Sequence, residues 1–286
     1  MPVSQARGFS LIELMVSMAI LFVVVGTAVN YIAIATQRSK VEQTKVDLAQ
    51  EGREFVDEFE RDIHQAGYPG CDFFNGLGSA NCATTANYNK ATLAMGLVSI
   101  SYTNIIFEGD VNGDGLVESV QYRLVDSNLN YPPASCPCIL QRSQVTKVAG
   151  LSAPAYTQAT SWSQELQNIV NSGSPAANAA YGGGVAISGN VLFGGGSVSN
   201  TAYYAAVSSF KDFPVFCAYD QNGILVQLPL DATSFAGQQA LNKIRSIRLT
   251  INLLGSATTG YDLKTGLRPV VTLVGDGRRN NKMAWE

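Results

Sequence analysis

The stretch that decides the fold lies at residues 7–35 and reads RGFSLIELMVSMAILFVVVGTAVNYIAIA. From Phe9 to Gln37 it carries one charged side chain, that of Glu13, and the segment Leu14–Val29 is almost wholly apolar. In a helix that rises about 1.5 Å per residue, some 20 such residues cross the roughly 30 Å hydrocarbon core of a bilayer. The stretch therefore predicts a membrane-spanning helix.

The charges on either side of the apolar run predict its orientation. Arg7 precedes the run, and acidic and basic residues are mixed after it. By the positive-inside rule the short N-terminus lies in the cytoplasm, and the rest of the chain lies outside.

The residues alone leave two fates open for the apolar run: removal as a signal, or retention in the finished protein. As a conventional secretory signal it would be removed by a cut after Ala33-Ile34-Ala35. The run is long for such a signal and keeps Glu13 near its start, although a charged residue costs about 2.5–3.5 kcal/mol at mid-bilayer. On the residues alone, Glu13 is interpreted as a carboxylate that reaches back to the membrane interface.

The heptapeptide Arg7-Gly8-Phe9-Ser10-Leu11-Ile12-Glu13 resembles the leader motif of the type IV prepilin family. The resemblance implies that a prepilin peptidase cleaves after Gly8, removes residues 1–8 as a leader peptide, and N-methylates Phe9. It also implies that the helix is retained and that Glu13 pairs with the N-terminal ammonium of a neighbouring subunit. Each of those charges is costly alone in a low-dielectric bundle, so pairing would set the register of assembly.

After Thr36 the pattern becomes amphipathic, with an apolar stripe that recurs every seven and then every four residues: Ile34, Val41, Leu48, Phe55, Phe59 and Ile63. The chain has no proline from Val3 to Tyr68, so one helix is predicted from about Phe9 to Gln65, ending at Gly67. Residues 9–36 form its transmembrane half and residues 37–66 its amphipathic half. The stripe fits packing on the protein's own sheet, with a coiled coil as the alternative.

The end of this helix carries a second resemblance. The segments Glu51–Arg53, Arg61–Tyr68 and Gly70-Cys71 look like the corresponding part of PilW-type minor pilins. The resemblance implies a minor pilin. His64, the single histidine, is interpreted as a capping or packing residue of the helix end.

Residues 67–286 read as an extracytoplasmic, β-rich globular domain. Alternation or β-rich composition predicts strands at residues 97–107, 116–125, 247–253 and 268–274, and Asp220–Gly223 predicts a hairpin turn between two further strands. A stretch rich in Gly, Ser and Ala from about 143 to 209 is predicted as an insertion. The fold class is α+β and pilin-like: a long N-terminal helix packed on an antiparallel β-sheet.

The segment Asp110-Val111-Asn112-Gly113-Asp114-Gly115 opens like a calcium loop, with oxygen donors at its first, third and fifth positions. The ligands would be Asp110, Asn112, Asp114, the Leu116 carbonyl and Glu118. The twelfth position is Gln121 in place of the usual Glu, and Asn-Gly and Asp-Gly are strong turn dipeptides. A tight turn and a weak calcium site are both open, and no other cofactor is expected.

The chain has five cysteines, which fit disulfides outside the cytoplasm better than zinc. Cys71 and Cys82 bracket a short loop and are the best predicted pair, worth roughly 3 kcal/mol in the chain-entropy model. Cys136 and Cys138 are predicted to be too close for self-pairing, so one of them, with Cys138 the candidate, is expected to join Cys217.

Composition excludes several classes of function. With 19 basic and 22 acidic residues the net charge is −3, which gives no footprint for nucleic acid. One histidine and no nucleophile–base constellation argue against an enzyme.

The predicted function is that of a minor pilin in type IV pilus assembly. A type II secretion minor pseudopilin and a pilus-tip adhesin are the alternatives. The expected partners are other pilin subunits, the prepilin peptidase and the inner membrane, with the domain finally displayed on the pilus or cell surface.

Overall fold

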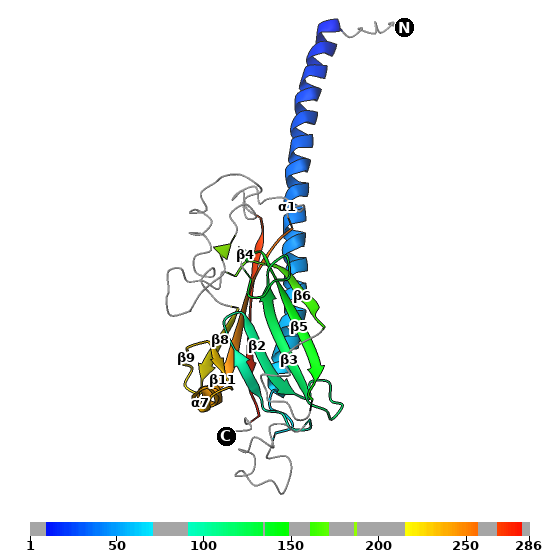
Figure 1. The fold of residues 1–286 in the computed structure, drawn as a ribbon. Coiled ribbons are helices and arrows are strands. Elements are labelled where there is room, and N and C mark those ends of the chain that lie inside the picture. The colour runs from blue at the N-terminus through cyan, green and yellow to red at the C-terminus, as the bar shows by residue number, and fades with distance from the viewer. Residues whose placement is uncertain are drawn as a thin grey trace, which may run out of the picture.

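The computed structural model describes residues 10–70, 91–133, 135–148, 161–171, 186–187, 215–256 and 268–281. A long helix, α1 (Leu11–Gln65), projects from an antiparallel sheet and packs on it with its C-terminal half (Figure 1). The predicted α+β, pilin-like fold is confirmed.

The N-terminal half of α1 stands clear of the rest of the described chain. Residues 10–36 are exposed throughout, and α1 is long and apolar enough to cross a membrane. The helix ends where the sequence predicts, at Gln65. Gly67 follows with φ +84°, a backbone conformation that favours glycine.

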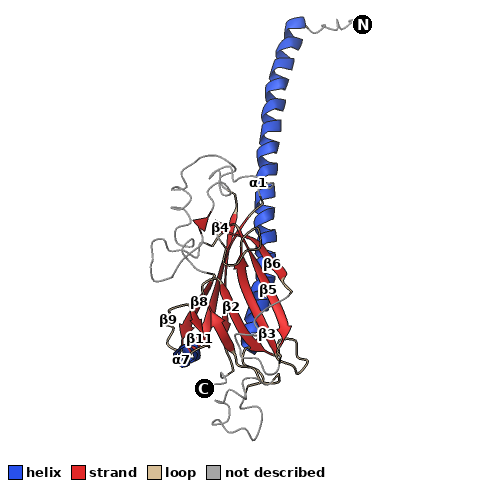
Figure 2. Cartoon of the chain, in the orientation of Figure 1, coloured by secondary structure: helices blue, strands red, loops and turns tan. Residues whose placement is uncertain are grey.

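One sheet carries most of the strands, which Figure 2 shows in red. Its order is β10-β1-β2-β3-β5-β6-β11-β8-β9, with β12 also paired to β11 and every pairing antiparallel. The strands are β1 (Leu97–Ile100), β2 (Asn104–Gly109), β3 (Glu118–Val125), β5 (Cys138–Thr146), β6 (Ser163–Ile169), β8 (Phe216–Asp220), β9 (Leu225–Val226), β10 (Leu230–Asp231), β11 (Ile244–Leu254) and β12 (Val270–Arg278). Outside it lie the parallel pair β4 (Ser135–Cys136) and β7 (Ala186–Ile187), and helix α7 (Phe235–Lys243).

The sheet curves back on itself. Its two end strands, β9 and β10, are joined by residues 227–229 alone, so the two ends must lie close together. Tyr102, after β1, links them: its carbonyl accepts from the Phe216 N–H at 3.2 Å and its hydroxyl accepts from the Leu228 N–H at 3.3 Å. The concave face receives the C-terminal half of α1.

Aromatic side chains form the centre of the core between α1 and the sheet. The ring of Phe59 lies 5.5 Å from that of Tyr122 and 5.8 Å from that of Phe216, and Phe55 meets Tyr122 edge-on at 5.7 Å. Such edge-to-face and offset pairs are favourable packing geometries.

The predicted apolar stripe of α1 is confirmed from Val41 to Ile63. Val41, Phe55, Phe59 and Ile63 are buried, and Leu48 packs against the core at its margin. The first member, Ile34, is 36% exposed, so its predicted place on the sheet is wrong. The stripe packs on the protein's own sheet, as α1 lies against β12, β11 and β6.

Glycines allow α1 to approach the sheet closely. A Cβ on Gly52 would lie 1.8 Å from Leu273 Cδ1, and one on Gly277 would lie 2.8 Å from Ile63 Cβ. Gly52 therefore marks the close crossing of helix and strand.

The substitution Gly277→Ala is expected to lower the free energy of unfolding by about 1–3 kcal/mol through overpacking. The obstacle is the branched stem of Ile63, which cannot swing aside as a flexible side-chain end could. Urea unfolding of the full chain in detergent, followed by near-UV circular dichroism, measures the loss. Val274→Ala, at a 54% exposed site in the same strand, is the control and should change stability by less than about 0.5 kcal/mol. Equal effects would contradict the packing account.

The prediction that residues from about 143 to 209 form an insertion is wrong in part. Residues 143–146 lie in β5 and residues 163–169 form β6, and both strands belong to the main sheet. The Ser, Gln and Asn residues of these two strands are also common in loops. β5 nevertheless pairs with β3 from Ile139 to Thr146.

Candidate functional site

The exposed half of α1 is the first candidate site. Large apolar side chains cover it on all sides; Leu11, Ile12 and Phe22 are 78%, 71% and 73% exposed. A helix that is apolar all round is stable only inside a membrane or inside a bundle of helices. This half of α1 is thus built to be surrounded by lipid or by other helices.

Glu13 lies in the first turn of α1, within the apolar surface. None of the ion pairs among the described residues involves it, and Ser17 bonds to its backbone carbonyl and not to its carboxylate. A carboxylate near a helix N-terminus is favoured by the helix dipole, but inside lipid it still needs a cation. Gly8 and Phe9 lie outside the described residues.

A buried polar cluster locks the other half of α1 to the sheet. Asp62, 1% exposed, accepts from the Tyr122 hydroxyl at 2.6 Å and from Arg142 Nη2 at 2.8 Å and Nε at 3.0 Å. Arg142 Nε also lies 3.4 Å from Glu58 Oε1. The cluster joins α1, β3 and β5 and so fixes the angle at which α1 leaves the sheet.

The electrostatics of this cluster follow from burial and charge. Burial and the adjacent Asp62 carboxylate raise the pKa of Tyr122 well above its usual value. Burial alone would lower the pKa of Arg142, but Tyr122 and Asp62 outweigh it, and the net shift is upward. Burial raises the pKa of Glu58, against the opposing effect of Arg142. Arg142 therefore stays a cation beside Asp62.

Asp62 was not among the functional residues predicted from the sequence. The residue lies three positions after Phe59 and seven after Phe55, on the buried face of the helix. An acid on that face predicts a buried cationic partner, and this signal would have identified the cluster.

A second buried ion pair lies at the end of the sheet far from the apolar half of α1. Lys147 Nζ contacts Glu108 Oε2 at 2.7 Å, and both side chains are fully buried. Lys147 also donates to the Leu93 carbonyl at 2.8 Å, and Glu108 accepts from the Met95 N–H at 3.0 Å. The pair thus holds residues 93–95 against β2.

The loop predicted as a calcium site forms a turn that its own carboxylates organise. Asp110 accepts from the N–H groups of Gly113 at 2.7 Å and Gly115 at 3.0 Å, and Glu118 accepts from the Val111 N–H at 3.1 Å. Gly113 and Gly115 have φ of +77° and +85°, as the turn interpretation requires. Burial and the acids Asp114 and Asp110 raise the pKa of Glu118, with the backbone bond to Val111 opposing.

Calcium binding by this loop stays a prediction. Asp114 accepts from the Leu116 N–H at 2.8 Å, and the Asn112 amide donates to Asp114 at 2.9 Å, so these side chains are also engaged within the turn. In the described part of the chain, no three His, Cys, Asp or Glu side chains are grouped to hold a metal ion. Calorimetric titration of the full chain with Ca²⁺ tests it: saturable heat that Asp110→Asn removes would support binding, and heat without saturation would refute it.

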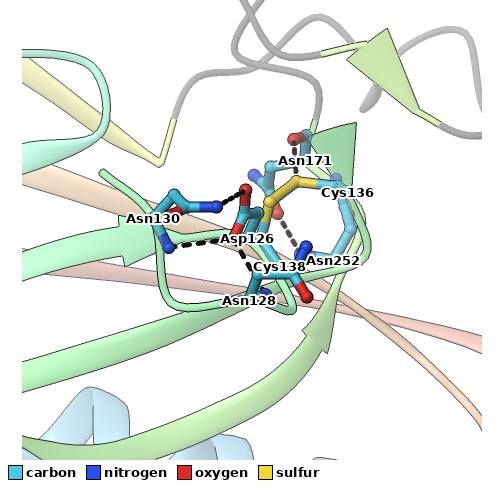
Figure 3. The surroundings of a disulfide bond; sticks show 7 residues. All are labelled: Asp126, Asn128, Asn130, Cys136, Cys138, Asn171 and Asn252. Atoms are coloured by element: carbon cyan, nitrogen blue, oxygen red, sulfur yellow. Dashed lines mark hydrogen bonds between the residues drawn. A yellow bond between two sulfur atoms is a disulfide. The ribbon is translucent and has the colours of Figure 1, made fainter. Parts of the chain in front are cut away.

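The predicted bond between Cys138 and Cys217 is wrong. Cys136 and Cys138 form a disulfide with each other (Figure 3). Cys217 in β8 is a buried free thiol. The Cα atoms of Cys136 and Cys138 lie 4.4 Å apart, a separation that a disulfide can span, so the spacing that seemed too short is sufficient. Cys71 and Cys82 lie outside the described residues, and their pairing stays a prediction.

Asparagine side chains surround this disulfide (Figure 3). The Asn171 carbonyl oxygen lies 3.7 Å from Cys136 Sγ, and the Asn171 side chain accepts from the Asn252 N–H at 2.7 Å and donates to the Thr250 carbonyl at 2.7 Å. Asn171 thereby ties the disulfide to β11.

The cysteine assignment predicts a chemical pattern. Burial raises the pKa of the Cys217 thiol to about 11, so it should stay protonated, and slow to alkylate, until the pH approaches that value. Iodoacetamide at pH 8 should leave Cys217 unmodified in the folded chain and modify it after denaturation. Without reduction, the tryptic peptide 124–142, which contains both Cys136 and Cys138, should be lighter than its reduced form by two hydrogen atoms. A peptide cross-linked to Cys217 would contradict the assignment.

His64 is exposed in the last turn of α1. Asn281, which follows β12 in the chain, caps the backbone at this helix end. Its side-chain amide donates to the His64 carbonyl at 3.2 Å and to the Ala66 carbonyl at 3.3 Å. His64 thus lies at the helix end, and within the described residues it belongs to no group of side chains that could hold a metal ion.

Comparison with known proteins matches one family model. The model of the prokaryotic N-terminal methylation motif covers residues 3–29, which include the predicted cleavage site, Glu13 and most of the apolar run. No curated protein and no solved structure matches the chain.

Proposed function

We propose that the chain, whose N-terminal segment is that of a type IV prepilin, is a minor pilin that helps to assemble a type IV pilus. The observation that carries the proposal is the methylation motif at the start of a helix whose apolar half stands exposed. A subunit that polymerises through its helix needs both features. The motif marks where the new N-terminus is made, and the apolar surface is where neighbouring helices pack.

The proposed sequence of events follows from these residues. The prepilin peptidase cleaves after Gly8 and methylates Phe9, while the apolar half of α1 holds the subunit in the inner membrane. The globular domain lies on the extracytoplasmic side. On assembly, the helix exchanges lipid for the helices of other pilins, and Glu13 receives the N-terminal ammonium of a neighbour as its partner.

The assignment to minor pilins rests on the end of α1. Residues 61–68 resemble that region of PilW-type minor pilins, and three of them have structural roles: Asp62 in the buried cluster, Ile63 in the core, and Gly67 at the helix end. The role is structural: the buried charges described above bind elements of the fold to each other, and we assign no catalytic step to them.

Deletion of the gene in its native host tests the proposal. Surface pili, counted by electron microscopy, should become rare, and the wild-type gene should restore them. In sheared pili the protein should be present at a small fraction of the major subunit. Normal piliation with loss of protein secretion would favour a minor pseudopilin. Normal piliation with loss of adhesion would favour a tip adhesin.

A further inference from the structure

Two cations follow directly after the apolar half of α1. Arg38 and Lys40 are the only charged residues between Leu14 and Val41. Both are exposed, and the first buried residue of the helix is Val41, which is 3% exposed. Arg38 and Lys40 are called the cationic neck. The cationic neck is thus open to whatever surrounds α1 between its apolar half and the part that packs on the sheet.

The charges of the cationic neck are not compensated within the described part of the chain. None of the ion pairs there involves Arg38 or Lys40. The nearest acid along the helix, Glu42, contacts Lys45 at 2.9 Å instead. Because residues two apart do not face each other on a helix, Arg38 and Lys40 lie on different sides of α1 and require separate anionic partners.

The position of the cationic neck along α1 matches the headgroup layer of a membrane. The apolar residues end at Ala35, and Arg38 and Lys40 lie about 4.5 and about 7.5 Å further along the axis at about 1.5 Å per residue. A bilayer about 40–45 Å thick with a hydrocarbon core of about 30 Å has a polar layer of roughly 5–8 Å on each side. With Ala35 at the edge of the core, both cations lie in that layer, toward which long basic side chains at helix ends also reach.

We propose that the cationic neck binds the phosphates of anionic phospholipids, with separate lipids on the two sides of α1. The planar guanidinium of Arg38 suits two parallel hydrogen bonds to a phosphate, and Lys40 supplies a compact charge. Cations beside a membrane helix are attracted to anionic headgroups. Because the contacts lie on different sides of the helix, they hold α1 at one depth and place Val41, where the sheet begins to cover the helix, just outside the headgroup layer.

The depth of the cationic neck favours lipid over another subunit as its partner. A second copy of the chain inserted to the same depth would present its own Arg38 and Lys40 at this level, so like charges would meet. The phosphates of the headgroup layer are the anions that the membrane itself places there. This inference rests on the placement of the apolar half of α1 in a membrane, which is part of the proposed function, but it does not rest on pilus assembly.

Lipid preference is measured by electron paramagnetic resonance on the full chain in phosphatidylcholine vesicles at 0.1 M salt, with spin-labelled phosphatidylglycerol or phosphatidylcholine as the probe. The wild-type chain should associate with phosphatidylglycerol at least about threefold more strongly than with phosphatidylcholine. Combining Arg38→Gln with Lys40→Gln should remove most of this preference. Combining Arg38→Lys with Lys40→Arg keeps both charges and should keep the preference.

Arg53→Gln is the matched control. Arg53 is exposed on the same helix but lies about 20 Å beyond Lys40, about two Debye lengths at 0.1 M salt. Its removal takes away an equal charge outside the headgroup layer, so the preference for phosphatidylglycerol should not change.

The proposal is overturned if the wild-type chain shows no preference for phosphatidylglycerol, if the double glutamine variant keeps it, or if Arg53→Gln loses as much. Carbonate extraction of the same vesicles separates the two accounts. A chain that stays in the vesicles without the preference refutes the lipid contact alone, whereas a chain that carbonate releases refutes the membrane placement as well. Carbodiimide cross-links from Lys40 to a second copy, in place of the preference, would assign the cationic neck to a protein partner and also overturn it.

Discussion

Replacing Asp62 by alanine is expected to lower the free energy of unfolding by about 3–5 kcal/mol, the cost of removing one partner from a buried ion pair. The carboxylate is 1% exposed and accepts hydrogen bonds from both Tyr122 and Arg142. Alanine would leave the Arg142 charge and the Tyr122 hydroxyl without that partner, so their desolvation would be uncompensated.

Glu58→Ala is the matched control for Asp62→Ala. Glu58 lies one turn earlier on α1 and also approaches Arg142, at 3.4 Å, but its side chain is 32% exposed and solvent screens it. Its removal should cost less than about 1 kcal/mol. Urea unfolding of the full chain in detergent, measured by near-UV circular dichroism, compares the two. Similar midpoints for the two variants would show that Asp62 does not hold α1 to the sheet.

Replacing Glu13 by valine is expected to remove the protein from pili while leaving it in the membrane. Valine makes the apolar run more hydrophobic, so insertion should be at least as favourable. Assembly, by contrast, would leave the N-terminal ammonium of a neighbouring subunit without its counter-charge in a low-dielectric bundle. Incorporation into sheared pili should fall at least about tenfold, as a loss of about 1.4 kcal/mol or more implies.

The control for Glu13→Val is Ser17→Ala, one helical turn further on. Among the described residues, the Ser17 hydroxyl donates to the backbone carbonyl of Glu13 and not to its carboxylate, so its loss should change incorporation little. Immunoblots of membrane and sheared-pilus fractions give the ratio. Normal incorporation of Glu13→Val would exclude a pairing role for the carboxylate, and loss of the variant from the membrane fraction would show that Glu13 serves insertion.

The helix and the sheet could be predicted because their signals are local. The apolar run, the stripe from Val41 to Ile63 and the stop at Gly67 each depend on residues close in sequence, and the structure confirms them. Ile34 continues the same period but lies beyond the reach of the sheet, which periodicity alone cannot reveal.

The errors arose where distant segments meet. Cys217 was paired with Cys138 by elimination, whereas its burial in β8 keeps it apart from the disulfide of Cys136 and Cys138. The ion pair between Asp62 and Arg142 joins residues 80 positions apart, so no local pattern shows both partners. The residues of β6 were assigned to an insertion from their composition, because the sequence alone does not show which strands they pair with.

The mature N-terminus, measured by mass spectrometry on protein from the native host, tests the central claim most directly. If the apolar half of α1 is retained for assembly, the chain begins at Phe9, carries one added methyl group on its amine, and lacks residues 1–8. A chain that begins at Thr36 would have lost that half of the helix with Glu13, and the account of assembly would be wrong.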